Sequence, residues 1–227
     1  MPENPLLQST TTPATTAAHQ PISSTSNDNE SRNVKYKAEI TVPPSSAADD
    51  KALVQALTLL VNAVYSEAER EIYSAEFSRT SSSDVAALLR AGELAVAHPF
   101  RSGDQTSACA PPVGCIAMKQ AGPSTGEFGM LAVDPMHRSS GVGRDLVSFA
   151  EGWCRRRLLG ARNAAVRLEL LFPVHFQHEG KMRLHTWYEK LGYVLVELRD
   201  FEKAYPRLFE LLSGPTEFRV YEKKLEA

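Results

Sequence analysis

Residues 127–158 have the sequence EFGMLAVDPMHRSSGVGRDLVSFAEGWCRRRL, and this stretch decides the fold. Its first seven residues favour a strand that ends at Asp134-Pro135. A glycine loop at residues 138–143 leads directly into an amphipathic helix over about 142–159. The first turn of a helix has unpaired N–H groups and a partial positive charge. Strand, glycine loop and helix in this order therefore predict a binding site for a phosphate-bearing ligand.

The composition is that of an ordinary globular protein with one core of usual size. Of the 227 residues, 43% are hydrophobic and 23% are charged, and the formal net charge of -2 favours neither nucleic acid nor an anionic membrane as partner. Cys109, Cys115 and Cys154 form no CxxC pair, so we interpret them as reduced thiols of a cytoplasmic protein. We expect no membrane helix and no secretory or mitochondrial leader.

The chain is predicted to contain one folded domain. Residues 1–32 are rich in Ser, Thr, Pro and Ala, and we predict that they are disordered, whereas residues 33–227 form the domain. Hydrophobic periodicity predicts strands at about 34–42, 94–97, 114–118, 127–133, 166–172, 193–198 and 217–223, and helices at about 47–66, 85–91, 142–159 and 184–191. One mixed sheet with helices on both faces is the economical architecture for this order.

The spacing of the glycines distinguishes between phosphate-binding loops. A P-loop requires GxxxxGK[ST], which the chain lacks, and a dinucleotide fold requires GxGxxG, of which only Gly141-Val142-Gly143 is present. The pattern that remains is R-x-x-G-x-G between a strand and a helix, with a plain turn as the alternative.

With its surroundings, this pattern resembles the GNAT superfamily of acetyl-coenzyme A-dependent N-acetyltransferases. The matching segments are LAV at 131–133, RSSGVG at 138–143 and WYEKLGY at 187–193, the last with Tyr in place of the Phe of the family's YEKLGF segment. The resemblance covers about residues 34–225. It implies a GNAT-like acyl-coenzyme A N-acyltransferase fold of the α/β (α+β mixed) class, with one central mixed, mostly antiparallel twisted sheet and helices on both faces.

The resemblance also implies which residues bind acetyl-coenzyme A, the expected donor. The backbone of Leu131, Ala132 and Val133 would pair with the pantetheine arm as an added strand does. The pyrophosphate would be held by the amides of Ser139, Ser140, Gly141, Val142, Gly143 and Arg144. Arg138 would brace this loop or contact a phosphate.

The chemistry of acetyl transfer suggests two catalytic residues. An amine with a pKa of about 10 must lose a proton before it attacks a thioester. Glu127 is the candidate base, acting through a water, and strict alternation along the strand predicts that it shares a face with Leu131 and Val133. Tyr188 matches the family position of the acid that protonates the leaving thiolate. A solvated strand residue and a core tyrosine are the alternatives for Glu127 and Tyr188.

The sequence thus predicts an N-acetyltransferase that acts on the primary amine of a small molecule by direct attack. No Ser/His/Asp or Cys/His constellation supports an acyl-enzyme.

A protein lysine or N-terminal acetyltransferase and an inactive acyl-coenzyme A-binding module are the alternatives, and both a monomer and a homodimer stay open. The acidic residues of segment 67–76 either attract a cationic amine or form a solvated helix face. We expect no metal, since His175 and His178 have no carboxylate or cysteine partner near in sequence.

Overall fold

The computed structural model describes residues 38–75, 77–100 and 110–225, so the predicted disorder of residues 1–32 lies outside the described residues. The strands are β1 (Ala38–Thr41), β2 (Leu94–Pro99), β3 (Gly114–Gly122), β4 (Thr125–Val133), β5 (Ala165–Pro173), β6 (Val194–Arg199) and β7 (Thr216–Lys224). The α-helices are α1 (Lys51–Ala68), α2 (Ser82–Ala91), α3 (Val142–Arg157), α4 (Glu179–Lys190), α5 (Phe201–Ala204) and α6 (Pro206–Phe209), and short 3-10 helices are η1 (Ser45–Asp49) and η3 (Pro135–His137).

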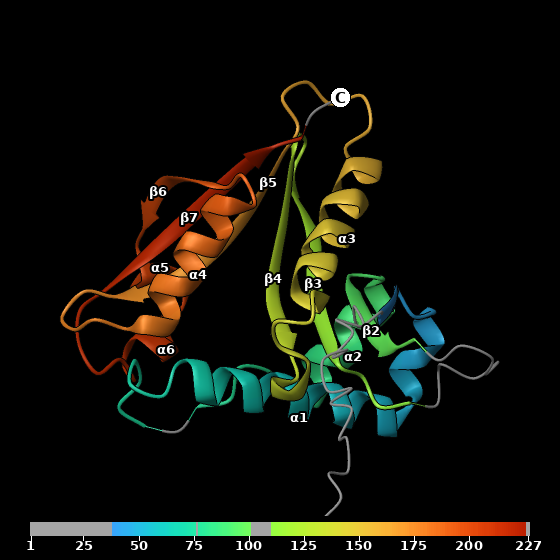
Figure 1. Ribbon diagram of the computed structural model, residues 1–227, viewed down its shortest axis with the longest axis horizontal. Helices are drawn as coiled ribbons and strands as arrows, with labels where there is room; N and C mark the ends of the chain where they lie inside the picture. The colour runs from blue at the N-terminus through green and yellow to red at the C-terminus, as the bar shows by residue number, and fades with distance from the viewer. Residues whose placement is uncertain (1–37, 76, 101–109, 226–227) are drawn as a thin grey trace, which may run out of the picture. The chain divides into compact units, whose positions relative to one another are not determined.

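The seven strands form one sheet in the order β1-β2-β3-β4-β5-β7-β6. Every neighbouring pair is antiparallel except β4 and β5, which run parallel. These two central strands pair only over Thr125–Glu127 and Ala165–Arg167, and Figure 1 shows them diverging beyond that point. The mixed, mostly antiparallel sheet predicted from the sequence is confirmed.

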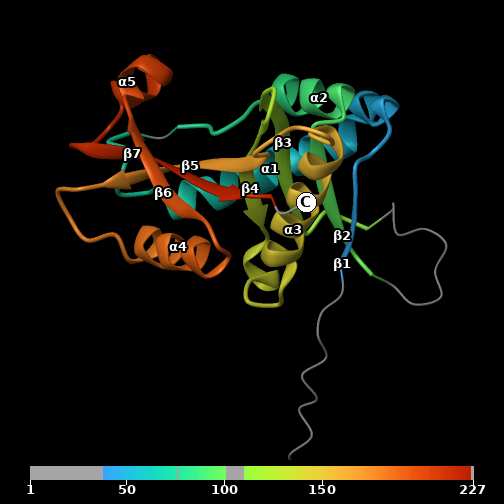
Figure 2. The same cartoon turned by 90° about the horizontal axis from the view of Figure 1, so that it is seen from above.

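Helices cover both faces of the sheet, as Figure 2 shows. On one face, α3 packs on the sheet through Val142, Leu146 and Trp153. This close packing requires a glycine at position 126 of β4, because a Cβ there would overlap Sγ of Cys154 on α3. The other face is covered by α1 and α2, and none of the helices in the described ranges is long and apolar enough to cross a membrane.

The observed bounds differ from the predicted ones most at three helices and one strand: α2 begins at Ser82 rather than 85, β3 extends to Gly122 rather than 118, and α1 and α4 begin elsewhere. The first long helix begins at Lys51, because the Asp50 carboxylate accepts hydrogen bonds from the amides of Ala52 and Leu53 at 3.0 and 3.1 Å. The fourth begins at Glu179 rather than near 184, since its first turns are polar and lack an apolar period. The four-residue helices α5 and α6 were not predicted because they are too short to show a period.

Candidate active site

The site is built around the point where β4 and β5 separate. Beyond Glu127 and Arg167 these strands no longer pair, so the edge of β4 that faces β5 has no strand partner over residues 128–133. Gly129 of β4 pairs with Ala117 of β3, and Ala132 pairs with Cys115, so three residue steps on β4 lie opposite two on β3. Within this stretch Met130 has a φ of 49°. This is a β-bulge, with one additional residue in β4. The bulged, unpaired edge offers peptide groups to an extended ligand.

The bulge changes which side chains share a face. Leu131 and Val133 pack toward α3, whereas Ala132 packs toward α1 and α2. Glu127 lies opposite Lys119 of β3, and Ala132 lies opposite Cys115. Because Lys119 and Cys115 are four residues apart on one strand, Glu127 and Ala132 are on the same face of the sheet. The prediction that Glu127 shares a face with Leu131 and Val133 is wrong, because it assumed strict alternation and the bulge adds one residue between them.

The glycine loop is braced by contacts to other parts of the chain. Both oxygens of the Glu67 carboxylate, at the end of α1, accept hydrogen bonds from the guanidinium of Arg138 at 2.7 Å. The hydrogen bond from Arg138 lowers the pKa of Glu67. Within the loop, the Ser140 hydroxyl donates to the His137 carbonyl at 2.6 Å. Arg138 was expected either to brace the loop or to contact a phosphate, and its bonds to Glu67 correspond to the bracing role.

The backbone of the loop forms a concave set of hydrogen-bond donors. Ser139 and Gly141 have φ values of 62° and 105°, and the amides of residues 139–144 donate to no acceptor among the described residues. A Cβ at Gly143 would meet Val133 and Trp187 only at ordinary distances, 3.8 and 3.9 Å, so the fold itself does not require a glycine there. Free amides at a helix N-terminus with open space before them fit an anion such as a pyrophosphate.

Tyr188 lies on α4 and belongs to the hydrophobic core that α3 and α4 share with the sheet. It is 6% exposed, and its ring is surrounded by the rings of Trp187, Phe128, Tyr193 and Tyr221 at centroid distances of 4.9, 6.3, 6.0 and 6.3 Å. Burial, and secondarily Tyr65 and Tyr221, raise the pKa of Tyr188. The hydroxyl therefore stays protonated and can serve as a donor.

Glu127 belongs to a polar cluster on the opposite face of the sheet. Its side chain is 17% exposed, and Oε1 accepts from Nζ of Lys119 at 2.7 Å, which leaves Oε2 for a water or an amine. Beside it, Glu169 of β5 pairs with Arg199. Burial, and then the charge of Glu127, raise the pKa of Glu169. Burial, and then the charge of Glu169, raise the pKa of Tyr205.

The segment that follows α1 is joined to the segment before β7 by backbone hydrogen bonds. The amide of Ser74 donates to the Leu211 carbonyl at 2.7 Å, and that of Ser213 donates to the Ile72 carbonyl at 2.9 Å. Sequence reasoning missed this pairing because it joins residues more than 130 positions apart.

The acidic residues of segment 67–76 are in part engaged within the chain. Glu67 is held by Arg138, and Glu69 forms a buried ion pair with Nζ of Lys181 at 2.5 Å, with side chains 8% and 4% exposed. Glu71 is exposed, and Glu76 lies outside the described residues. An attraction of cationic amines by Glu67 and Glu69 is therefore not supported.

The two histidines considered for a metal have other partners. His178 accepts a hydrogen bond from the Lys181 amide at 3.3 Å and caps α4, and Nδ1 of His175 lies 3.1 Å from the Pro215 carbonyl. In the described ranges, no group of three or more His, Cys, Asp or Glu side chains is arranged to hold a metal ion.

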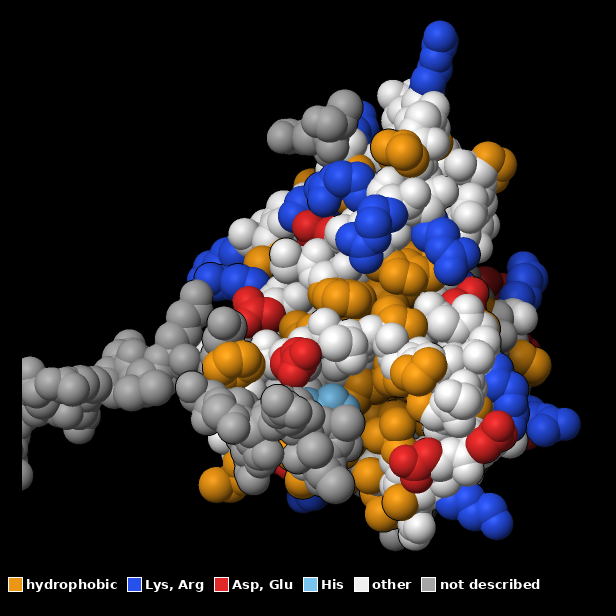
Figure 3. Space-filling model, turned by 90° about the vertical axis from the view of Figure 1, so that its right-hand side faces the viewer, with side chains coloured by type: hydrophobic (Ala, Val, Ile, Leu, Met, Phe, Trp, Pro, Cys, Tyr) orange, Lys and Arg blue, Asp and Glu red, His pale blue; other side chains and the backbone are white. Residues whose placement is uncertain are grey.

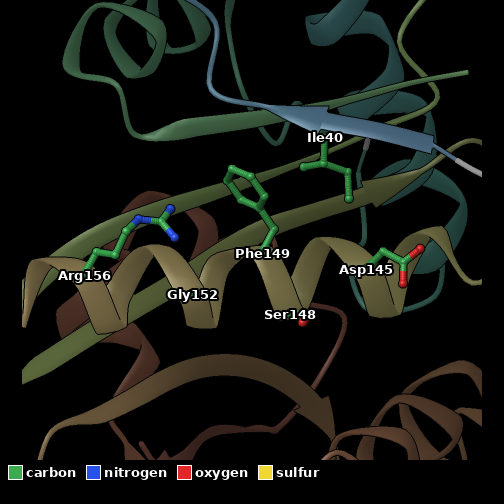
Figure 4. Close-up of a pocket in the computed structure, with 6 residues that line it drawn as sticks. All are labelled: Ile40, Asp145, Ser148, Phe149, Gly152 and Arg156. Atoms are coloured by element: carbon green, nitrogen blue, oxygen red, sulfur yellow. The ribbon is translucent and has the colours of Figure 1, made fainter. Parts of the chain in front are cut away.

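A separate cavity of about 340 Å³ lies between β1 and the outer side of α3, shown in Figure 4. Figure 3 shows hydrophobic side chains along this face of the molecule, with Lys and Arg side chains gathered above them. The cavity is lined by Ile40, Asp145, Ser148, Phe149, Gly152 and Arg156. None of these belongs to the loop amides, Glu127 or Tyr188, so the cavity is distinct from the candidate active site.

Comparison with known proteins agrees with this geometry. Residues 107–195 match the family model of the acetyltransferase (GNAT) domain. No curated protein sequence matches the chain. Among solved structures, the NatC complex bound to Gag peptide and CoA matches with 16% identity and a TM-score of 0.53, covering 84% of this chain and 99% of that chain.

Two further solved structures share the fold at similar levels. Ard1 from Thermoplasma volcanium has 15% identity and a TM-score of 0.53, with 84% of this chain and 99% of that chain covered. An aminoglycoside 6'-N-acetyltransferase complexed with coenzyme A has 17% identity and a TM-score of 0.52, with 79% and 94% covered.

Proposed function

Because this chain carries an acetyltransferase domain of the GNAT family, we propose that it transfers an acetyl group from acetyl-coenzyme A to the primary amine of a small molecule. The family match confirms the resemblance predicted from the sequence. The observation that carries the proposal is the row of free amides at residues 139–144 beside the unpaired edge of β4. These amides suit the pyrophosphate, and the edge over residues 128–133 suits the pantetheine arm, whose own amide groups can pair with a strand.

The proposed reaction needs one proton removed and one proton supplied. Acetyl-coenzyme A supplies the thioester carbon, where a C–N bond forms to the amine and the C–S bond breaks. Glu127 takes the amine's proton through a water that its free Oε2 positions. Tyr188 gives its hydroxyl proton to the leaving sulfur of coenzyme A. Burial raises the pKa of Tyr188, and the same burial raises the pKa of a coenzyme A thiol beside it.

Direct attack is supported by the state of the described cysteines. Cys115 and Cys154 are buried free thiols. Burial raises the pKa of Cys115 to about 12 and that of Cys154 to about 11. Neither residue provides the thiolate that an acyl-enzyme route would use.

A small amine suits the site better than a peptide does. Backbone hydrogen bonds between Ser74 and Leu211 and between Ser213 and Ile72 join the segment after α1 to the segment before β7, and we propose that this pairing closes the acceptor end of the site. A peptide acceptor would need an open groove along the sheet, whereas a small molecule needs an enclosed pocket.

The test is a turnover screen with purified protein and acetyl-coenzyme A, in which the release of free thiol is measured. The acceptors are simple amines, polyamines, amino acids and basic peptides. We expect saturable thiol release with a subset of the small amines. Turnover with peptides alone would support a protein acetyltransferase. Binding of acetyl-coenzyme A without thiol release across the panel would instead support an inactive binding module.

A further inference from the structure

The end of α1 is bonded to two separate parts of the candidate active site. The carboxylate of Glu67 accepts two hydrogen bonds of 2.7 Å from Arg138, which begins the glycine loop. Two residues further on, a carboxylate oxygen of Glu69 accepts from Nζ of Lys181 at 2.5 Å. Lys181 lies on α4, the helix that carries Tyr188. One short segment is therefore tied both to the loop proposed for the donor and to the helix of the candidate acid.

The ion pair of Glu69 with Lys181 is buried, with side chains 8% and 4% exposed. Removing two charges from water is costly, and apolar side chains of similar volume often stabilise a protein as well as a buried ion pair does, or better. Stability alone therefore does not account for an ion pair at this place. An ion pair differs from apolar packing in geometry, because its hydrogen bond forms only over a narrow range of distances and directions. This pair thus fixes how α4 lies against the end of α1.

Lys181 and Tyr188 lie on the same face of α4. They are the two buried residues of this helix, and they are seven positions apart, which is close to two full turns. Because a helix of this length moves as a rigid element, a displacement at Lys181 also displaces Tyr188. The anchor at one end of the buried face therefore sets the position of the phenol at the other end.

The helix α4 also lies against the end of the glycine loop. A Cβ added at Gly143 would lie 3.9 Å from the ring of Trp187, the residue before Tyr188. The helix and the amides of residues 139–144 are thus close neighbours. A movement of α4 along its axis changes the distance between the Tyr188 hydroxyl and a donor that is bound at these amides.

We propose that Glu69 and Lys181 are positioning residues for the acetyl transfer. Their ion pair fixes α4 along its axis and so places the Tyr188 hydroxyl at the sulfur that leaves as coenzyme A. The ion pair of Glu67 with Arg138 holds the glycine loop to the same end of α1, so the loop and α4 share one anchor. A misplacement of about 1 Å costs about 10²-fold in rate. This inference rests on the proposed function and on the acid role of Tyr188.

The test removes the ion pair without leaving a buried charge. The variant Glu69→Leu/Lys181→Met replaces it by apolar side chains. Its single-turnover rate is measured with acetyl-coenzyme A and the best amine of the turnover screen, well below the unfolding temperature. We expect this rate to fall by about 10- to 100-fold, with an unchanged Kd for acetyl-coenzyme A. In the Tyr188→Phe background the same replacement should cause no further loss, because the ion pair acts through the Tyr188 hydroxyl.

Two further variants separate position from stability. Leu89→Ala removes buried apolar contacts on α2, a helix that packs against α1 and β2. It should lower the unfolding temperature and leave the single-turnover rate unchanged. Glu69→Asp keeps both charges but shortens one side chain by one C–C bond, about 1.5 Å. It should lower the rate in the wild-type background and have no effect in the Tyr188→Phe background.

The outcomes distinguish this inference from the proposed function. The inference is overturned, while acetyl transfer stands, by an unchanged rate in Glu69→Leu/Lys181→Met or by an equal loss in the Tyr188→Phe background. A rate loss of the same size in Leu89→Ala also overturns it. If the double variant does not fold, Glu69→Asp decides by the same criteria. No thiol release by the wild-type protein with any amine refutes the proposed function, and the inference with it.

Discussion

Replacing Gly143 by alanine separates the needs of the fold from those of the ligand. The added Cβ would lie 3.8 Å from Cγ2 of Val133 and 3.9 Å from the Trp187 ring, which are ordinary van der Waals distances. Gly143 is the second residue of α3, where alanine is favoured over glycine by up to about 1 kcal/mol. The Gly143→Ala variant should therefore unfold at the same temperature as the wild type or up to about 4 °C higher.

The effect on the donor should have the opposite sign. A methyl group before the free amides of residues 139–144 occupies space that a pyrophosphate would use. Inserting such a group into a close contact costs about 1–3 kcal/mol, which corresponds to a roughly 5- to 150-fold weaker Kd for acetyl-coenzyme A. Calorimetric titration gives the Kd, and circular dichroism gives the unfolding temperature.

The matched control is Gly152→Ala on the same helix. Its Cβ would meet only the flexible end of Arg156, at 3.6 Å, away from the loop. It should gain helix stability like Gly143→Ala and bind acetyl-coenzyme A like the wild type. If Gly143→Ala is folded and also binds like the wild type, the phosphate does not approach this amide, and the proposed donor site is refuted.

Three other predictions concern the catalytic groups and the ion pair beside them. Tyr188→Phe should reduce kcat by about 10²-fold or more with an unchanged Kd for acetyl-coenzyme A, and unchanged turnover would exclude the acid role. Because the pKa of Tyr188 is raised, wild-type kcat should show no loss from its ionisation as the pH rises to about 10. Glu127→Gln should lower kcat/KM by about 10²-fold and make it rise further with pH, since solvent must then remove the amine's proton; an unaltered pH profile would point to another base. Lys181→Met should lower the free energy of unfolding by about 3–5 kcal/mol by leaving Glu69 buried and unpaired, and Lys181→Met/Glu69→Leu should recover part of it in denaturant titrations; equal losses would argue against a buried pair.

Local sequence was sufficient to predict the donor side of the site. The strand, the glycine loop and α3 follow one another within about thirty residues, and each has its own signature in alternation, glycine spacing or helical period. Tyr188 could be named because its segment resembles that of a known family. The mixed sheet followed from the order of the elements, since few architectures accommodate it.

Only the tertiary structure decided how the acceptor side is arranged. The residue with positive φ in the bulge is Met130 rather than a glycine, so the sequence does not mark its position, yet the bulge places Glu127 on the face opposite Leu131. Glu69 and Lys181 are ordinary charged residues in the sequence, and their buried ion pair becomes visible only when the end of α1 meets α4. The physical reason is that strand order and helix starts depend on neighbours along the chain, whereas register, burial and charge pairing depend on residues that meet only after the chain has folded.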